Sequence, residues 1–150
     1  MLIFYQSGLA QLLLFGKFRT MMFFGTVITK NKSLTDKSKR HEGTHIKQYW
    51  ECLLLGLVLW ILIAGIVALC GGHVSCWWLC AVPLTYYLMY GAEWAVSYLY
   101  HILRGDAREK WNDAAYHASA FEMEAYAHED DPDYLPTRRW YAFTKYYGAI

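Results

Sequence analysis

Residues 52–70 read CLLLGLVLWILIAGIVALC, a stretch of nineteen residues without a charged side chain. At about 1.5 Å of rise per residue, a helix of this length nearly matches the roughly 30 Å hydrocarbon core of a bilayer. A second apolar run, residues 76–100, contains a single charge at Glu93, and only GGHVS separates the two runs. The pattern predicts a transmembrane helical hairpin with spans at 52–70 and 76–100.

The alternative is a pair of buried core helices in a soluble protein. A chain of 150 residues has room for one domain, 1–150, and could hardly cover two such helices on all sides. We therefore expect a mainly α, integral-membrane fold. A carboxylate within a span is costly, so Glu93 should face protein or water and find a polar partner.

The distribution of basic residues predicts the orientation of the hairpin. All fourteen Lys and Arg lie outside it, eight before Cys52 and six after Tyr100. Because such residues stay on the cytoplasmic side during insertion, both flanks should face the cytoplasm from an inner or plasma membrane. The net charge of +1 excludes the broad basic surface of a nucleic-acid binder. The expected contact of the basic residues is the lipid bilayer.

The segments outside the hairpin have their own patterns. Residues 1–19 are apolar but short for a span, so we expect an interfacial or membrane-dipping segment, with a third crossing as the alternative. Residues 20–29 are β-branched and aromatic, and favour a strand or a hairpin. The helix expected at 36–50 begins at an N-cap, Thr35 or Asp36, and can run unbroken into the first span. Residues 107–129 have the composition of a helix.

The chemistry in this sequence centres on His41, Glu42 and His45, which form the pattern H-E-x-x-H. On a helix, residues four apart share one face, so both imidazoles can reach one zinc ion. Glu42 would then lie beside the remaining coordination position, where it can take a proton from a metal-activated water. Gln48 lies on the same face and can support the site. The alternative is that both histidines are ordinary polar residues at the end of a membrane helix, with no role in metal binding.

A third protein ligand is expected from the helix predicted at 107–129. Glu122 and Glu124 are about 200° apart around such a helix, so only one can point at the metal. Glu122 shares its face with small residues that would allow a close approach of the two helices, whereas Glu124 shares a stripe with larger ones. The sequence therefore favours a Zn²⁺ site made of His41, His45 and Glu122. The other candidates are Glu124, His117 and His128.

The pairing of HEGTHIKQ (41–48) with FEMEAYA (121–127) resembles the gluzincin clan of zinc metallopeptidases. The resemblance implies that the metal ligands are His41, His45 and Glu122, and that Glu42 is the general base. It also implies a minimal zincin-like site in which the segment at 20–29 aligns a peptide substrate by backbone pairing. Many membrane members carry an aspartate where this chain has Tyr126, a departure that removes the family's usual hydrogen bond from this position to a histidine.

The expected function is that of a membrane-embedded, zinc-dependent metallopeptidase that hydrolyses peptide bonds with zinc-activated water at the cytoplasmic membrane surface. Its partners would be a peptide or protein substrate and the lipid bilayer. Tyr116, His117 and Tyr126 are of the right type to stabilise the oxyanion. The alternative is a non-catalytic, metal-binding membrane scaffold or interaction protein, in which a fourth protein ligand such as His117 closes the site. A weaker third possibility is a transport subunit built on Glu93.

Overall fold

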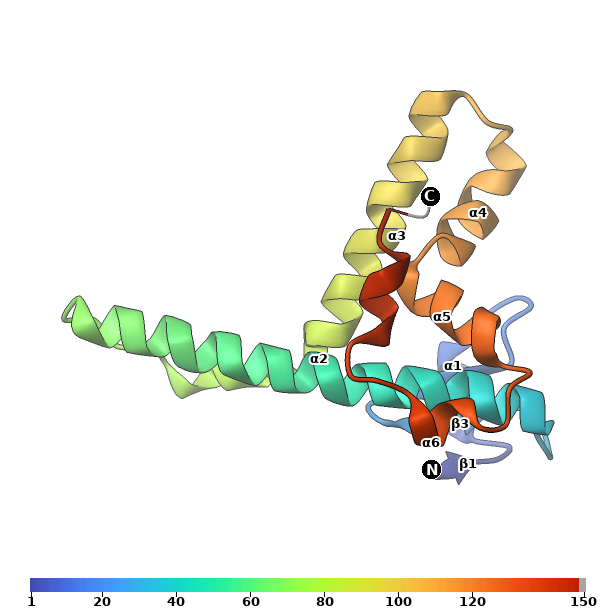
Figure 1. Cartoon of the computed structure of the whole chain (residues 1–150), viewed down its shortest axis with the longest axis horizontal. Helices are drawn as coiled ribbons and strands as arrows, with labels where there is room; N and C mark the ends of the chain where they lie inside the picture. The colour runs from blue at the N-terminus through green and yellow to red at the C-terminus, as the bar shows by residue number, and fades with distance from the viewer. Residues whose placement is uncertain (149–150) are drawn as a thin grey trace. The chain divides into compact units, whose positions relative to one another are not determined.

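The computed structural model describes residues 1–148 and is mainly helical (Figure 1). The sequence predicts one domain, but the contacts separate the chain into two compact units. The first comprises Met1–Gln48 together with the described residues from Ala120 onward, and the second comprises Tyr49–Ser119. One long helix, α2 (Asp36–Leu69), contributes residues to both units.

The first unit contains a three-stranded sheet of β1 (Ile3–Phe4), β2 (Thr20–Phe23) and β3 (Thr26–Thr29). The order is β1-β3-β2, with β1 parallel and β2 antiparallel to the central strand. The turn between β2 and β3 is Phe24-Gly25, and both residues have positive φ, at 46° and 76°. Two positive φ values are the signature of the turn whose twist matches a tight hairpin. Of the two forms expected for 20–29, the structure has the hairpin, and β2 is an outer edge of the sheet.

Residues 1–19 form β1 and a short helix, α1 (Gly8–Leu13), which begins where the Ala10 amide donates to the Ser7 hydroxyl at 3.4 Å. Six helical residues cover only about 9 Å, so α1 is far too short for a third crossing. Ala10 and Leu14 pack on Ile28 of β3 and form a small core. Most other large apolar side chains of this segment are exposed, namely Met1, Leu2, Phe4, Tyr5, Leu9, Leu12, Leu13, Phe15 and Phe18.

The rest of the first unit consists of α5 (Ala120–His128), α6 (Tyr134–Thr137) and a 3₁₀ helix, η3 (Ala142–Tyr146). The rings of Phe121 and Phe143 stack with centroids 4.5 Å apart and are fully buried. This pair packs α5 against η3.

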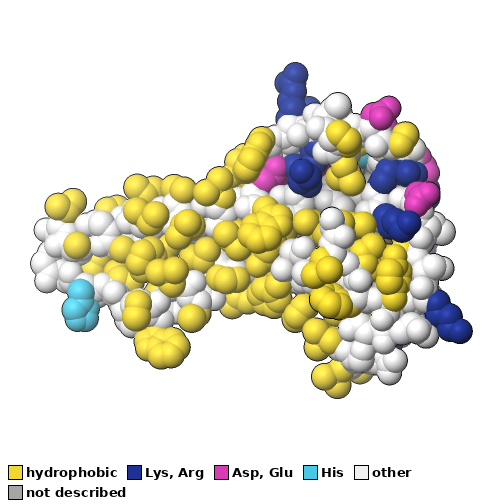
Figure 2. Space-filling model, turned by 90° about the horizontal axis from the view of Figure 1, so that it is seen from below, with side chains coloured by type: hydrophobic (Ala, Val, Ile, Leu, Met, Phe, Trp, Pro, Cys, Tyr) yellow, Lys and Arg dark blue, Asp and Glu magenta, His cyan; other side chains and the backbone are white. Residues whose placement is uncertain are grey.

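Helix α2 begins at Asp36 with Thr35 as its cap, because the Thr35 hydroxyl accepts from the Ser38 amide at 3.1 Å. No proline interrupts it before Leu69, so the segment at 36–50 and the first apolar run form one helix. Among the described residues, α2 is the one helix long and apolar enough to cross a membrane by length and composition. Only 11% of its apolar window is buried, unlike the core helix of a soluble protein. The apolar part of α2 extends to the left in Figure 1 and in Figure 2, and hydrophobic side chains cover much of the surface there.

The segment at 76–100 is not a single α-helix as predicted. Cys76–Leu84 forms a 3₁₀ helix, η1, and the α-helix α3 runs from Thr85 to Arg104. Pro83 explains the division, since it has no amide hydrogen and its ring clashes with the carbonyl four residues earlier in an α-helix. The Thr85 hydroxyl donates to the Val82 carbonyl at 2.8 Å, just where the α-helix begins.

The single helix predicted at 107–129 is also wrong. A 3₁₀ turn, η2 (Arg108–Lys110), leads into α4 (Trp111–His117), and α5 starts only at Ala120. The break falls at Ser119, whose buried hydroxyl donates to the Glu93 carboxylate of α3 at 2.8 Å. Packing of α4 alongside α3 thus overrides the helical propensity of the segment, and Glu93 has the polar partner expected for it.

Gly56→Ala should destabilise the second unit. A methyl group at Gly56 would lie 3.1 Å from Cβ of Thr85 and closer still to its hydroxyl, which the Val82 carbonyl holds in place. Such overpacking costs about 1–3 kcal/mol, more than the roughly 1 kcal/mol that alanine gains in helix propensity. Thermal unfolding in detergent, followed by circular dichroism, measures the difference. Gly65→Ala is the control, since nothing lies within 4 Å of its added carbon, and its Tm should not fall.

Candidate metal centre

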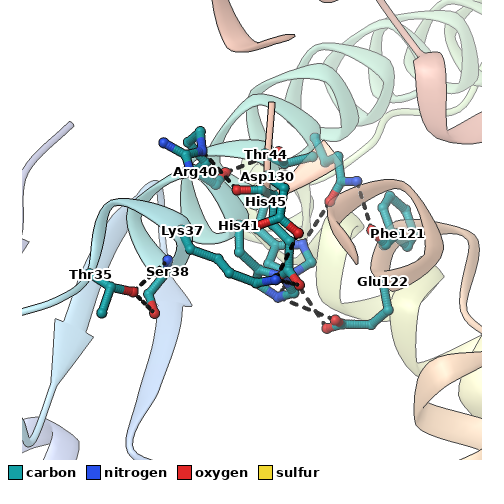
Figure 3. Close-up of polar contacts among 12 residues, drawn as sticks. Thr35, Lys37, Ser38, Arg40, His41, Thr44, His45, Phe121, Glu122 and Asp130 are labelled. Atoms are coloured by element: carbon teal, nitrogen blue, oxygen red, sulfur yellow. Dashed lines mark hydrogen bonds and ion pairs between the residues drawn. The ribbon is translucent and has the colours of Figure 1, made fainter. Parts of the chain in front are cut away.

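The first turns of α2 place two imidazoles on one face of the helix. Nε2 of His41 and Nε2 of His45 lie 3.2 Å apart, as the four-residue spacing requires (Figure 3). His45 is buried and His41 half-buried. Gly43, between them, lies on another face, where its missing side chain makes room for Leu135 of α6; an added carbon there would meet Leu135 Cδ1 at 2.7 Å.

Glu122 of α5 completes the group. Its Oε2 lies 3.4 Å from Nε2 of His41, and its Oε1 lies 3.3 Å from Nε2 of His45. Donor atoms that surround a zinc ion tetrahedrally at about 2.0–2.1 Å are about 3.3–3.4 Å apart. Within the described part of the chain, these three side chains form the group of His, Cys, Asp and Glu residues that could hold a metal ion. The donor types and their spacing fit zinc.

Charge is concentrated in this group. Burial lowers the pKa of His45, but the carboxylate of Glu122, the bond to it and the contributions of Glu42 and Gln48 outweigh burial and raise the pKa to about 9. Burial acts upward on the pKa of Glu122, yet the two imidazoles hold it well below its usual range. Glu122 is therefore an anion with only 3% of its surface exposed. In the metal-free group the His45 imidazolium compensates this anion, and a metal ion bound by the neutral imidazole would displace that proton.

Glu42 lies beside this group with only 8% of its surface exposed. Burial raises the pKa of Glu42, against the opposing effects of His45, His41 and a hydrogen bond from the Met22 amide of β2. Its Oε2 makes no hydrogen bond to any of the described residues. The carboxyl group is thus desolvated and held on one side by the sheet edge, and its pKa is raised.

A carboxylate that the sequence analysis did not identify orients His41. Oε2 of Glu129 lies 3.1 Å from Nδ1 of His41, and the Lys37 ammonium contacts both Glu129 and Asp130, at 3.1 and 2.8 Å. Glu129, just after the end of α5, thus contacts the imidazole of His41, although position 126 carries a tyrosine and not an aspartate. Glu129 follows Glu122 by seven residues and so shares its face, which is the sequence signal that could have revealed it.

A second buried network orients His45. Its Nδ1 lies 2.8 Å from Oε1 of Gln48, whose amide donates to the Phe121 carbonyl at 3.0 Å and to Glu124 at 3.1 Å. Gln48 thus supports the site as predicted from its position. Glu124 is fully buried and is neutralised by the guanidinium of Arg138, and it also accepts from the Tyr134 hydroxyl at 2.6 Å. The sequence provided no signal for Arg138 and Tyr134.

The other candidate residues lie elsewhere. Glu124 is held in the network just described, and His128 stacks on Tyr134 with ring centroids 3.6 Å apart. Tyr116 and His117 belong to the second unit, where the His117 ring lies 3.8 Å from the Asp113 carboxylate. Of the three proposed oxyanion donors, Tyr126 is the one in the unit that holds the histidines. Its ring packs edge-on against His41 with centroids 4.7 Å apart.

Comparison of the chain with protein-family models, curated proteins and solved structures gives no significant match.

Proposed function

We propose that this chain is a membrane-bound zinc metallopeptidase that hydrolyses peptide bonds at the cytoplasmic surface. The observation that carries the proposal is the convergence of His41, His45 and Glu122 beside the buried carboxyl group of Glu42. Catalytic zinc sites usually have three protein ligands and keep a further position for water or substrate, whereas structural sites are closed by four. No fourth His, Cys, Asp or Glu joins the group among the described residues.

The role proposed for each side chain follows from its position. Zinc, when bound, lowers the pKa of a coordinated water and polarises a carbonyl oxygen. The two imidazoles and Glu122 would hold the ion, with the rings oriented by Glu129 and Gln48. Oε2 of Glu42 would take the proton from the attacking water and pass it to the leaving amine. The raised pKa of Glu42 suits both steps, because the group must accept a proton and then release it.

The edge strand β2 provides a place for an extended substrate. In an antiparallel ladder, hydrogen-bonded and non-hydrogen-bonded residue pairs alternate. The Arg19 carbonyl accepts from the Lys30 amide at 2.8 Å, so by this alternation Met22 and Val27 form a non-hydrogen-bonded pair. The Met22 amide therefore points away from β3. It points instead to Glu42, which ties the outer edge of the sheet to the proposed base. A peptide paired along this edge would bring its backbone to the metal group, in the β-addition mode of recognition.

The membrane placement is part of the proposal. His45 precedes Cys52 by seven residues on α2, so it lies about 10 Å along the helix from the apolar run. The exposed apolar side chains of residues 1–19 suit the bilayer interface. A crossing by α2 and a return through η1 and α3 would form the hairpin, although α3 lacks the apolar composition of α2. The basic flanks of the hairpin would then face the cytoplasm.

Chelation tests the proposal on the full-length protein purified in detergent. We expect about one equivalent of zinc per chain, hydrolysis of a mixed peptide library, complete loss of hydrolysis with a chelator, and recovery when zinc is added back. Mass spectrometry of the peptides and elemental analysis of the protein are the two measurements. Bound zinc without turnover would favour the alternative, a metal-bound membrane scaffold, and absence of metal binding would contradict both.

Glu129→Ala should weaken zinc binding about 10- to 100-fold, the usual effect of removing a group that orients a metal-binding histidine. The loss follows because Nδ1 of His41 no longer has its carboxylate at 3.1 Å. Competition with a chromophoric chelator measures the affinity. Asp130→Ala is the matched control, since Asp130 also binds Lys37 but is largely exposed and makes no contact with the histidines. Equal losses in the two variants would assign the effect to Lys37 instead.

A further inference from the structure

The first unit contains a cavity of about 190 Å³ on the side of the Glu124 network that faces α6 and η3. Arg138, which belongs to that network, is among its lining residues, but none of the metal-group residues is. The stacked rings of His128 and Tyr134 form one wall, and the Tyr146 hydroxyl lies 3.2 Å from Nε2 of His128. The remaining lining residues are Thr137, Arg139, Ala142 and Lys145.

The cavity carries uncompensated positive charge. Arg138 is neutralised by Glu124, but Arg139 and Lys145 are exposed, and neither side chain has an ion pair with any of the described residues. No Asp or Glu lines the cavity. Two cations beside this cavity therefore lack a local counter-charge, and a bound anion would relieve their mutual repulsion.

We propose that this cavity binds the phosphate group of an anionic ligand. A phosphate monoester carries a charge of about −1.5 to −2 at neutral pH, which matches the two uncompensated cations. Arginine and lysine are the usual partners of phosphate oxygens, and the Tyr146 hydroxyl adds a polar group on the cavity wall. Since a water occupies about 30 Å³ in the liquid, the volume accommodates a phosphate group with some of its water. The proposal does not depend on the metal centre.

Another cavity of the first unit, on α2, also has cationic side chains in its lining but is less suited to an anion. Its lining includes the cationic side chains of Lys39, Arg40 and Lys47. Lys39 is paired with Asp36 at 2.9 Å, and Arg40 donates to the Glu129 carbonyl at 2.7 Å. Two of its three cations are thus already engaged, so it presents a weaker anion site than the cavity of Arg139 and Lys145.

Isothermal titration calorimetry of the full-length protein in detergent tests the proposal. The probes are inorganic phosphate, dihexanoyl phosphatidic acid and, as the control without net charge, dihexanoyl phosphatidylcholine. The double variant Arg139→Gln/Lys145→Gln removes both cations of the cavity. Lys32→Gln/Lys110→Gln removes the same charge at positions that line neither cavity. All four side chains are exposed, so both variants should fold, which far-ultraviolet circular dichroism verifies.

We expect saturable binding of a phosphate-bearing probe that weakens at least tenfold in Arg139→Gln/Lys145→Gln and less than threefold in the control variant. Binding of both phosphate probes would support recognition of the phosphate group alone. Binding of phosphatidic acid only would assign the site to a lipid headgroup, and binding of inorganic phosphate only to a soluble ligand. Absence of saturable binding, or equal weakening in both variants, would overturn the proposal.

Discussion

Glu42→Gln is expected to retain the bound metal and lose peptide hydrolysis by at least about 100-fold, the lower end of what a general base contributes. Glutamine preserves the shape of the side chain and can still accept the hydrogen bond from the Met22 amide. It cannot take a proton from water. The ligands His41, His45 and Glu122 are unchanged, so zinc content should stay near one equivalent. Elemental analysis and peptide turnover, measured on the same preparation, separate the two properties.

Glu51→Gln is the control for this substitution. Glu51 is also a buried glutamate of α2, with 4% of its surface exposed, but it is not part of the metal group. We expect it to retain both zinc and turnover. Hydrolysis by Glu42→Gln at a rate close to that of the unmodified protein would exclude Glu42 as the base.

His45→Ala should abolish stoichiometric metal binding and, with it, all hydrolysis. His45 contributes one of three donors, and its removal leaves His41 and Glu122 as a pair too weak for a stable site. A direct ligand should matter more than the roughly 10- to 100-fold of an orienting group. The protein with its metal site intact should gain about 2.7 kcal/mol of stability at a zinc concentration of 100 times Kd. The variant should gain none, which a zinc-dependent thermal shift measures.

His73→Ala provides the matched histidine control. His73 is exposed in the turn after α2 and lies in the second unit. Its loss should leave both the zinc equivalent and the thermal shift intact. A zinc-dependent shift that persists in His45→Ala would show that the ion binds elsewhere and would contradict the proposed centre.

His41, His45 and Glu122, the ligands that the sequence predicts, lie together in the structure, but not for the reason that the sequence suggests. A continuous helix over 107–129 would place small residues on both sides of Ser119 on the face of Glu122. Instead, the helix is interrupted at Ser119, and of these small residues only Ala125 lies on the same helix as Glu122. Glu122 approaches the histidines because α5 belongs to the unit that contains the start of α2.

Local patterns were enough for part of the fold and of the site. The spacing of His41 and His45 places their rings together on any α-helix, and the uncharged run after Cys52 continues that helix. Likewise, the β-branched and aromatic residues of 20–29 favour extended structure, as a strand or a hairpin. Each of these features depends on neighbours within a few residues along the chain, so periodicity and backbone preference decide it.

The remaining features depend on segments that are distant in the sequence. Glu129 reaches His41 across 88 residues, and Gln48 meets Glu124 across 76. The break before α5 depends on the bond between Ser119 and Glu93, which overrides a helical composition. The phosphate cavity likewise needs α5, α6 and η3 to surround one space. No local pattern encodes such contacts, because the free energy that selects them comes from burial and charge pairing in the folded chain.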